Sequence, residues 1–219
     1  MEILSRLRLL LTLGRGVVRG LPPADEARDP FDLFGEWYRA AQRSGIFLPE
    51  AAALSTATSD GAPSSRMVLL KSFDERGFVF FTNHGSRKAR EMEDNPRVAL
   101  LFYWGVLERQ VRVEGTVGRI PHEESAAYFA TRGRGSRIGA WASRQSAELG
   151  SRAELEERFA EVERGFEGKD VHLPPFWGGY RLVPRVVEFW QGKANRLHDR
   201  LSFTRRGMAD PWKVRRLYP

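Results

Sequence analysis

Residues 82–88 (Thr-Asn-His-Gly-Ser-Arg-Lys) carry the clearest anion-binding chemistry in the sequence. They leave an apolar stretch and open a predicted helix, so free backbone N–H groups, hydroxyls and two cations fall together. This combination favours the binding of a phosphate or another anion. A solvated helix start with a basic surface has the same composition and is the more frequent case, so residues 82–88 alone do not decide between the two.

Arg66 and Lys71 bracket an apolar run that is predicted to be a strand. Residues five apart have opposite parity in a regular strand, so these cations point to opposite faces and lie roughly 16 Å apart. One phosphate cannot contact both, whereas an elongated ligand or two ligands could, if a bulge or curvature re-aims one side chain. The alternative is that the charges protect an edge strand against aggregation.

Tyr128, Arg132 and Ser136 recur at every fourth residue, which would place them on one face of a continuous helix. Gly133 and Gly135 argue against such a helix, so we expect the trio to turn from a helix end into a loop. A phenol, a guanidinium and a hydroxyl can clamp a phosphate by charge-assisted hydrogen bonds. The alternative is that these three are ordinary polar residues on the protein surface.

Residues 188–192 and 196–200 (Glu-Phe-Trp-Gln-Gly and Arg-Leu-His-Asp-Arg) form the most distinctive stretch. Trp190 and His198 supply planar groups that can stack on an aromatic ring, and Arg196 and Arg200 supply donors that can polarise it. The alternative is a surface network of arginines and aspartates, with Trp190 in an ordinary core.

Several other kinds of site are excluded by the sequence. Gly133, Gly135 and Gly139 resemble a dinucleotide-binding fingerprint, but the spacing is one residue too long and the preceding segment is predicted to be helical. There is no Walker-type phosphate loop and no nucleophile elbow. The four histidines are scattered and cysteine is absent, so we expect no metal site and no disulfide.

The length and composition are typical of one globular domain. A chain of 219 residues with 42% hydrophobic residues is long enough to bury a substantial core. The net charge of +7 should attract anions such as phosphates, nucleic acid or a membrane surface, without choosing among them. Because cysteine is absent, a reducing compartment is permitted and the cytoplasm is the expected location.

The periodicities predict a mainly β protein with helical additions. Strands are expected at residues 52–58, 65–73, 78–83, 97–104, 108–120, 179–190, 201–205 and 212–217. Helices are expected at residues 30–44, 85–95, 121–131, 138–143 and 151–166. Asp29 is the expected N-cap of the first helix, with Pro30 at its first position. Strands at both ends of the chain with helices between them favour an antiparallel barrel over a doubly wound sheet.

The first 28 residues are predicted to be an N-terminal arm, expected to be mobile, which precedes a single domain at residues 29–219. Residues 1–20 are basic and leucine-rich, but their longest apolar stretch is too short for a signal-peptide core or a membrane span. An organellar transit segment is the alternative, because the stretch is rich in arginine and nearly free of acids.

Eight motifs in one order carry a resemblance to a known family. They are R-M-V-L-L-K, T-N-x-G-S-R-K, N-P-R-V-x-L-L-F, L-E-R-Q-V, the Tyr/Arg/Ser trio, I-G-A-W-A-S-x-Q-S, F-W-G-G-Y-R, and E-F-W-Q-G followed by R-L-H-D-R. Together they resemble the pyridoxamine 5′-phosphate oxidase family from about residue 29 to residue 219. The resemblance implies an antiparallel split β-barrel of the FMN-binding type and a homodimer with two FMN sites at the subunit interface.

The resemblance also implies roles for individual residues. The expected contacts of the FMN phosphate and ribityl chain are Arg66, Thr82, Arg87, Lys88, Gln145 and Ser146, with Met67, Val68, Leu69, Lys71 and Phe81 among the cofactor-binding residues. Gln110, Trp190 and Arg200 are expected near the flavin ring. The substrate phosphate is expected on Lys71, Tyr128, Arg132 and Ser136. Arg196 and His198 are the expected catalytic pair, holding the pyridine ring over the flavin. Arg66 and Lys71 then serve different phosphates.

The activity implied is oxidation of pyridoxamine or pyridoxine 5′-phosphate to pyridoxal 5′-phosphate, with O₂ as acceptor and release of H₂O₂, and of ammonia from the amine. Alternatives are a related flavin oxidase acting on another reduced ring, such as a phenazine precursor, and a non-catalytic flavin- or B6-binding protein. A nucleic-acid binder is suggested only by the charge of +7, and the sequence lacks interleaved aromatic and basic residues. We therefore expect neither nucleic acid nor membrane as a partner.

Overall fold

The computed structural model describes residue 21 and residues 28–219. The predicted arm at residues 1–28 lies almost entirely outside the described residues. Within the described part of the chain, no helix is both long enough and apolar enough to cross a membrane.

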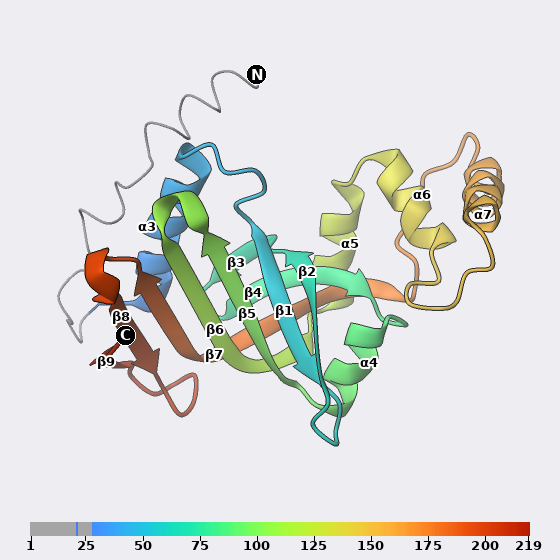
Figure 1. The fold of residues 1–219 in the computed structure, drawn as a ribbon. Helices are drawn as coiled ribbons and strands as arrows, with labels where there is room; N and C mark the ends of the chain where they lie inside the picture. Colours follow the sequence, from blue (N-terminus) through green and yellow to red (C-terminus); the bar gives the residue numbers. More distant parts are fainter. Residues whose placement is uncertain (1–20, 22–27) are drawn as a thin grey trace.

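Nine strands of the described chain form one antiparallel sheet that curls into a half-barrel (Figure 1). The strands are β1 (Ala51–Ala57), β2 (Pro63–Leu69), β3 (Ser72–Asp74), β4 (Gly77–Asn83), β5 (Arg97–Trp104), β6 (Arg109–Arg119), β7 (Trp177–Gln191), β8 (Asp199–Thr204) and β9 (Lys213–Leu217). Their order is β2-β1-β5-β6-β7-β4-β3, with β8 paired to β7 and β9 paired to β8. The predicted fold class, mainly β with helical additions, is confirmed.

The long strand β7 is where the sheet divides. One edge of β7 pairs with β6, while its other edge pairs first with β4 and then with β8. Pro184 lies between these two partners and has no N–H to donate to a ladder. On the β6 side the register shifts between Glu114 and Gly115, and a Cβ on Gly115 would lie 2.0 Å from the carbonyl oxygen of Val183. The bulge and the proline together split the barrel.

Five helices and two short 3₁₀ turns of the described chain complete the fold. They are α3 (Pro30–Arg43), α4 (Arg87–Asp94), η1 (Gly105–Leu107), α5 (His122–Ala130), α6 (Arg134–Ala142), α7 (Arg152–Gly165) and η2 (Ala194–Arg196). The predicted cap of α3 is confirmed, because the Asp29 carboxylate accepts the N–H of Phe31 at 2.7 Å. Phe34 of α3 packs edge-on against Phe73 and Phe78 at ring distances of 4.8 and 4.9 Å, so α3 fills the barrel core.

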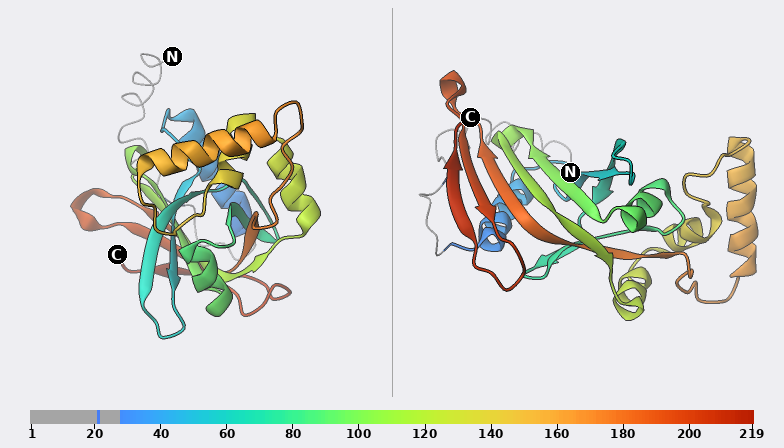
Figure 2. Two further views of the ribbon diagram at one scale, coloured as in Figure 1. Left: turned by 90° about the vertical axis from the view of Figure 1, so that its right-hand side faces the viewer. Right: turned by 90° about the horizontal axis from the view of Figure 1, so that it is seen from below.

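The helices and the C-terminal strands lie at opposite ends of the sheet (Figure 2). Helices α5, α6 and α7 gather at one end, and β8 and β9 lie at the other. Strand β7 runs between the two ends and therefore connects two regions that both contain predicted site residues.

Two sequence predictions need correction. The predicted strand at residues 65–73 is two strands, because the chain leaves the β1 ladder after Leu69 and Lys71 instead donates its N–H to Val79 at 2.8 Å. The parity comparison of Arg66 with Lys71 assumed one regular strand and does not apply. Helix α6 begins at Arg134 instead of residue 138, so Ser136 lies in a helix and not in a loop. The predicted break at Gly133 is confirmed, since this residue separates α5 from α6.

Candidate functional site

A cavity of about 570 Å³ opens between β4, the end of β2 and helices α5 and α6. Its lining residues are Leu69, Lys71, Phe81, Thr82, Asn83, Tyr128, Arg132, Ser136, Gly139, Ala140, Ser143, Gln145 and Trp177. All four residues predicted to bind the substrate phosphate are present. Lys71 lies between β2 and β3, and the other three lie in α5, in α6 and in the turn between these helices. Five residues predicted to bind the cofactor line the same space, namely Leu69, Lys71, Phe81, Thr82 and Gln145, so the predicted cofactor and substrate sites adjoin.

Arg132 is held in the cavity wall by aromatic rings. Its guanidinium carbon lies 4.7 Å from the ring centroid of Trp177 and 5.5 Å from that of Phe129. Within the described chain, the buried Nη1 atom has no hydrogen-bond partner. Burial lowers the pKa of Arg132, but an arginine keeps its charge in proteins. A buried, charged donor without a partner is suited to an incoming anion.

Three parallel rings form the wall beside this arginine. Phe81 stacks on Tyr128 with a centroid distance of 4.0 Å and on Trp177 with a distance of 5.3 Å, at interplanar angles of 20° and 11°. Phe81 was predicted to contact the cofactor. Its ring lines the cavity and stacks on both the phenol of Tyr128 and the indole of Trp177, so it also fixes these two rings relative to each other.

Lys88, Thr82 and Gln145 form a hydrogen-bonded triad beside the cavity. The Lys88 Nζ donates to Thr82 Oγ1 and to Gln145 Oε1, both at 3.2 Å, and Thr82 donates to the same amide oxygen at 3.0 Å. Burial, with the positive charge of Arg66, lowers the pKa of Lys88. Nearby, the backbone N–H of Arg87 donates to Ser146 Oγ at 3.1 Å. The structure thus brings the predicted FMN-phosphate residues together at the start of α4.

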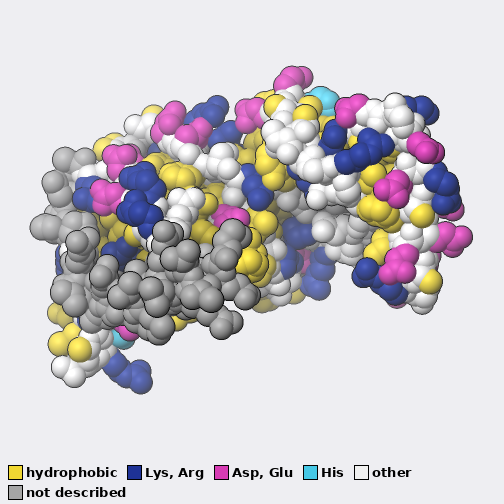
Figure 3. Space-filling view, turned by 90° about the horizontal axis from the view of Figure 1, so that it is seen from above, with side chains coloured by type: hydrophobic (Ala, Val, Ile, Leu, Met, Phe, Trp, Pro, Cys, Tyr) yellow, Lys and Arg dark blue, Asp and Glu magenta, His cyan; other side chains and the backbone are white. Residues whose placement is uncertain are grey.

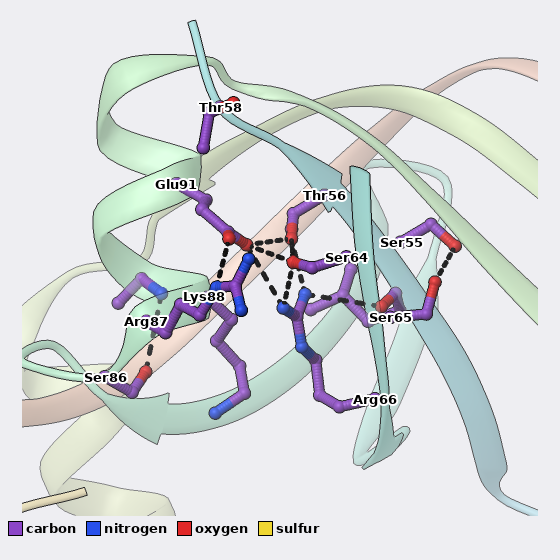
Figure 4. Close-up of polar contacts among 12 residues, drawn as sticks. Ser55, Thr56, Thr58, Ser64, Ser65, Arg66, Ser86, Arg87, Lys88 and Glu91 are labelled. Carbon is purple, nitrogen blue, oxygen red and sulfur yellow. Dashed lines mark hydrogen bonds and ion pairs between the residues drawn. The ribbon is translucent and has the colours of Figure 1, made fainter. Parts of the chain in front are cut away.

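Glu91 contacts two of these cations, Arg66 and Arg87, as Figure 4 shows. Its Oε2 atom lies 3.1 Å from Arg66 Nη2, and its Oε1 atom lies 2.8 Å from Arg87 Nε. The same carboxylate accepts hydrogen bonds from Thr56 at 2.5 Å and Ser64 at 2.6 Å. Burial alone would raise the pKa of Glu91, but these hydrogen bonds outweigh it and lower the pKa to about 2. Glu91 is therefore ionised and ties α4 to the β1–β2 hairpin.

Arg66 uses most of its donors within the protein. Its Nη1 donates to Leu54 O at 3.5 Å and makes a short hydrogen bond with Thr56 Oγ1, and its Nη2 donates to Ser64 Oγ at 2.5 Å. With the Glu91 contact, both terminal nitrogens are engaged. Of the three residues that follow it, Met67 points outward with 64% exposure, whereas Leu69 lines the cavity.

A second group of predicted site residues lies across β6, β7 and β8. Gln110 is paired with Trp190, and Trp190 with Arg200, so the three side chains form one row on a single face. The ring of His198 lies 4.7 Å from that of Trp190, and its Nδ1 atom accepts the N–H of Lys193 at 3.1 Å. The imidazole proton therefore sits on Nε2 when His198 is neutral.

Arg200 is held in this row by a carboxylate that the sequence did not single out. Its Nε and Nη2 atoms donate to Glu188 at 2.9 and 3.1 Å, and this hydrogen bonding raises the pKa of Arg200. Arg196, in contrast, lies in η2 with a φ of 60°, next to Asn195 with a φ of 57°. Two successive non-glycine residues in the left-handed region mark a strained loop, as is common at functional sites.

One chain does not bring the two groups together. Trp177 of the cavity and Trp190 of the second group lie near opposite ends of the 15-residue strand β7. At roughly 3.3 Å per residue, a strand of this length spans up to roughly 45 Å. The structure therefore contains two separate groups of predicted site residues, called half-sites below: the cavity beside α5 and α6, and the Gln110–Trp190–Arg200 row with Arg196 and His198 beside β8. Figure 2 shows these helices and this strand at opposite ends of the sheet.

Trp177 and Glu91 were missed as site residues. Trp177 was quoted only as part of the F-W-G-G-Y-R motif, and nothing in its local sequence indicates that it contacts Arg132, which lies in the turn after α5. Glu91 follows Arg87 by four residues in a predicted helix, a spacing that indicates an ion pair. Its contact with Arg66, 25 residues away in sequence, depends on tertiary structure.

An antiparallel barrel split along one long strand, with cation-lined sites at its end, defines a protein of the split-barrel class. Comparisons with known proteins are more specific. Residues 38–164 match the family model described as pyridoxamine 5′-phosphate oxidase, and residues 177–219 match that of the pyridoxine 5′-phosphate oxidase C-terminal dimerisation region. The chain belongs to the pyridoxamine 5′-phosphate oxidase family.

Individual relatives agree with this assignment. The pyridoxine/pyridoxamine 5′-phosphate oxidase of Rubrobacter xylanophilus is 64% identical over 87% of each chain, and that of Psychromonas ingrahamii is 54% identical over the full length of both. The crystal structure of PhzG from Burkholderia lata, in complex with tetrahydrophenazine-1-carboxylic acid, superposes with a TM-score of 0.85 at 34% identity, covering 92% of this chain and 98% of that one. An FMN binding protein from Nostoc punctiforme shares the fold, with a TM-score of 0.70 at 16% identity, covering 89% of this chain and 100% of that one.

Proposed function

We propose that this protein is an FMN-dependent oxidase that converts pyridoxamine 5′-phosphate or pyridoxine 5′-phosphate to pyridoxal 5′-phosphate, with O₂ as acceptor. The observation that carries the proposal is the convergence of Lys71, Tyr128, Arg132 and Ser136 on one cavity. Arg132 lines this cavity, and within the described residues its buried Nη1 atom has no hydrogen-bond partner, so the guanidinium keeps donor capacity for a phosphate. The names of the high-identity relatives support the same activity.

The residues beside the cavity suit an FMN phosphate and ribityl chain. Lys88, Arg66 and Arg87 supply positive charge, and Thr82, Gln145 and Ser146 supply polar groups at distances that already join them in one network. The cluster opens at the start of α4, where backbone N–H groups add to the attraction for an anion. When bound, FMN would accept a hydride equivalent from C4′ of the substrate and pass the electrons to O₂, which gives H₂O₂.

The protein's own residues bind and orient the substrate in this proposal. Lys71, Arg132, Tyr128 and Ser136 would hold its phosphate, which fixes one end of a small molecule in the cavity. Arg196 and His198 would hold the pyridine ring at the other end. His198 has its proton on Nε2 when neutral, because Nδ1 accepts a backbone hydrogen bond, so it can donate from the free side of the ring.

A homodimer would complete the site, because the two half-sites lie at opposite ends of β7. We infer that the Gln110–Trp190–Arg200 row of one chain meets the cavity of its partner. The outward face of β2, β1 and β5 supports such an assembly, since it exposes Met67 of β2 and, on the other side of β1, Leu101 and Tyr103 of β5. Residues 177–219 match a model named for dimerisation, which supports the same assembly.

A flavin oxidase acting on a phenazine precursor is the second candidate, supported by the structural similarity to PhzG. Four phosphate-binding side chains around one cavity favour a phosphorylated substrate. Nucleic-acid binding is not favoured, because Lys/Arg and Asp/Glu side chains alternate over the helical end on the face shown in Figure 3 instead of forming a basic stripe. The chain has no cysteine, and we place the reaction in the cytoplasm as part of the proposal.

Anaerobic mixing of the purified, FMN-loaded protein with pyridoxine 5′-phosphate tests the function. The flavin absorbance near 450 nm should bleach and should return when O₂ is admitted, with one H₂O₂ formed per pyridoxal 5′-phosphate. Bleaching by a dihydrophenazine carboxylate but not by the phosphorylated vitamer would favour the second candidate. A protein that binds FMN but bleaches with neither would be a non-catalytic member of the fold.

A further inference from the structure

Arg132 differs from Arg66 in how the protein holds it. The side chain of Arg66 is fixed by hydrogen bonds and by the Glu91 carboxylate, which occupy both of its terminal nitrogens. For Arg132, no side-chain hydrogen bond or ion pair occurs within the described residues, and its contacts are to ring faces. The two arginines therefore differ in how many donors remain for a further ligand.

A ring face can restrain a guanidinium without occupying its donors. The attraction between a cation and a π-system acts through the plane of the guanidinium, whereas its N–H groups point outward in that plane. A carboxylate in the same place would take two of these N–H groups and cancel the charge. Aromatic support therefore orients Arg132 and leaves it able to bind an anion.

Trp177 is the better placed of the two supporting rings. It lies closer to the guanidinium of Arg132 than Phe129 does, at 4.7 Å against 5.5 Å. Its own position is fixed, because it pairs with Asn83 at the β4–β7 ladder, stacks on Phe81 and meets Phe129 edge-on at 5.2 Å. Restraint from three sides makes the indole a rigid support.

We propose that Trp177 is a positioning residue that holds the Arg132 guanidinium toward the phosphate of the substrate, an inference that rests on the proposed function. Trp177 acts through Arg132 and governs how tightly the phosphorylated vitamer binds. It does not take part in hydride transfer or in holding FMN.

The test compares Trp177→Leu and Trp177→Phe with the wild-type holoenzyme. In Trp177→Leu, the KM for pyridoxine 5′-phosphate and the Kd for pyridoxal 5′-phosphate should both rise about tenfold. The kcat and the Kd for FMN should stay within about twofold, because neither depends on Arg132 in this proposal. Trp177→Phe keeps a ring face and should lose no more than about threefold, which also preserves the test if the leucine variant fails to fold.

The chain offers a matched control in a second Arg–Trp pair. The guanidinium of Arg205 lies 4.3 Å from the ring centroid of Trp212, far from the cavity in the C-terminal segment. Trp212→Leu removes a contact of the same kind and should leave the KM for pyridoxine 5′-phosphate unchanged. An equal rise in both leucine variants would mean that general loosening causes the effect, and would overturn the proposal.

A double-mutant cycle separates support of Arg132 from direct contact with the ligand. In an Arg132→Ala background, Trp177→Leu should change the Kd for pyridoxal 5′-phosphate by less than about twofold, because the residue it positions is gone. A full tenfold effect in that background would overturn the proposal. A wild-type protein that binds pyridoxal 5′-phosphate but oxidises neither vitamer would refute the proposed function, while the cycle would still report on the pair.

Discussion

Two cation clusters lie side by side in this protein, and they are built on opposite principles. At the start of α4, a buried carboxylate neutralises part of the charge of Arg66 and Arg87 and fixes their side chains. In the cavity, Arg132 has aromatic neighbours and a buried nitrogen without a partner in the described chain. The first arrangement suits a ligand that stays bound, since the protein contributes a rigid frame. The second arrangement suits a ligand that binds and dissociates in each turnover, because no carboxylate of the described chain competes with that ligand for Arg132.

The largest effect is expected from removing the carboxylate of the first cluster. Glu91→Ala would leave Arg66, which is only 20% exposed, without its counter-charge and would remove four hydrogen bonds. Breaking a buried pair in this way costs about 3 kcal/mol. The free energy of unfolding of the flavin-free protein, measured in urea, should fall by that amount. A loss below about 1 kcal/mol would show that Glu91 does not hold the cluster together.

In the second cluster, we expect an effect of similar size, but on activity and not on stability. Arg132→Ala should lower kcat/KM for pyridoxine 5′-phosphate roughly a hundredfold, because a charge-assisted contact with the phosphate is lost. The stability of the protein should change little, since this guanidinium makes no hydrogen bond within the described residues. Steady-state kinetics measure kcat/KM, urea denaturation measures the stability, and FMN fluorescence quenching measures FMN binding. Loss of FMN binding together with activity would show that Arg132 also holds the cofactor, which would contradict separate roles for the two clusters.

The loss of stability at low pH gives a second test of the first cluster. The pKa of Glu91 lies at about 2, below its ordinary value of 4.5, so the native state holds fewer protons than the unfolded state between these values. Its contribution to stability is complete above about pH 5 and is lost as the pH falls toward 2. Glu91→Gln should flatten this part of the profile of unfolding free energy against pH. An unchanged slope would assign the acid sensitivity to other carboxylates.

The smallest effect is expected at the exposed edge of the first cluster. Arg87 is 61% exposed, and its contact with Glu91 is therefore weakened by solvent. Arg87→Ala should lower the free energy of unfolding by less than about 1 kcal/mol, while weakening FMN binding more noticeably. Urea denaturation and FMN titration of the same variant distinguish the two. A stability loss as large as that of Glu91→Ala would contradict the assigned order.

The sequence was sufficient for the fold class and for the cationic residues of each cluster. Period-two alternation located most strands, and the capping signals at Asp29 and Ser151 located two helices, because these depend on local chemistry. The break of the predicted strand at residues 65–73 was not visible in the sequence. It arises because Lys71 pairs with Val79 in another ladder, which is a property of the sheet and not of the apolar run.

Spatial relations between distant segments were the part that sequence alone could not supply. The motifs place Trp190 and Trp177 close in sequence, yet strand β7 separates them. Conversely, Arg66 and Glu91 are distant in sequence but touch, because α4 packs on the β1–β2 hairpin. The roles of Trp177 and Glu91 emerge only from these contacts.

Mixing two inactive variants tests most directly whether one site needs two chains. Arg132→Ala disables the cavity half-site, and Arg196→Ala disables the other. If each site combines halves from both chains, a mixed dimer contains one intact site. Random re-association of equal amounts should then restore about a quarter of wild-type activity. Activity that stays at the level of the separate variants after subunit exchange has been demonstrated would contradict the two-chain site.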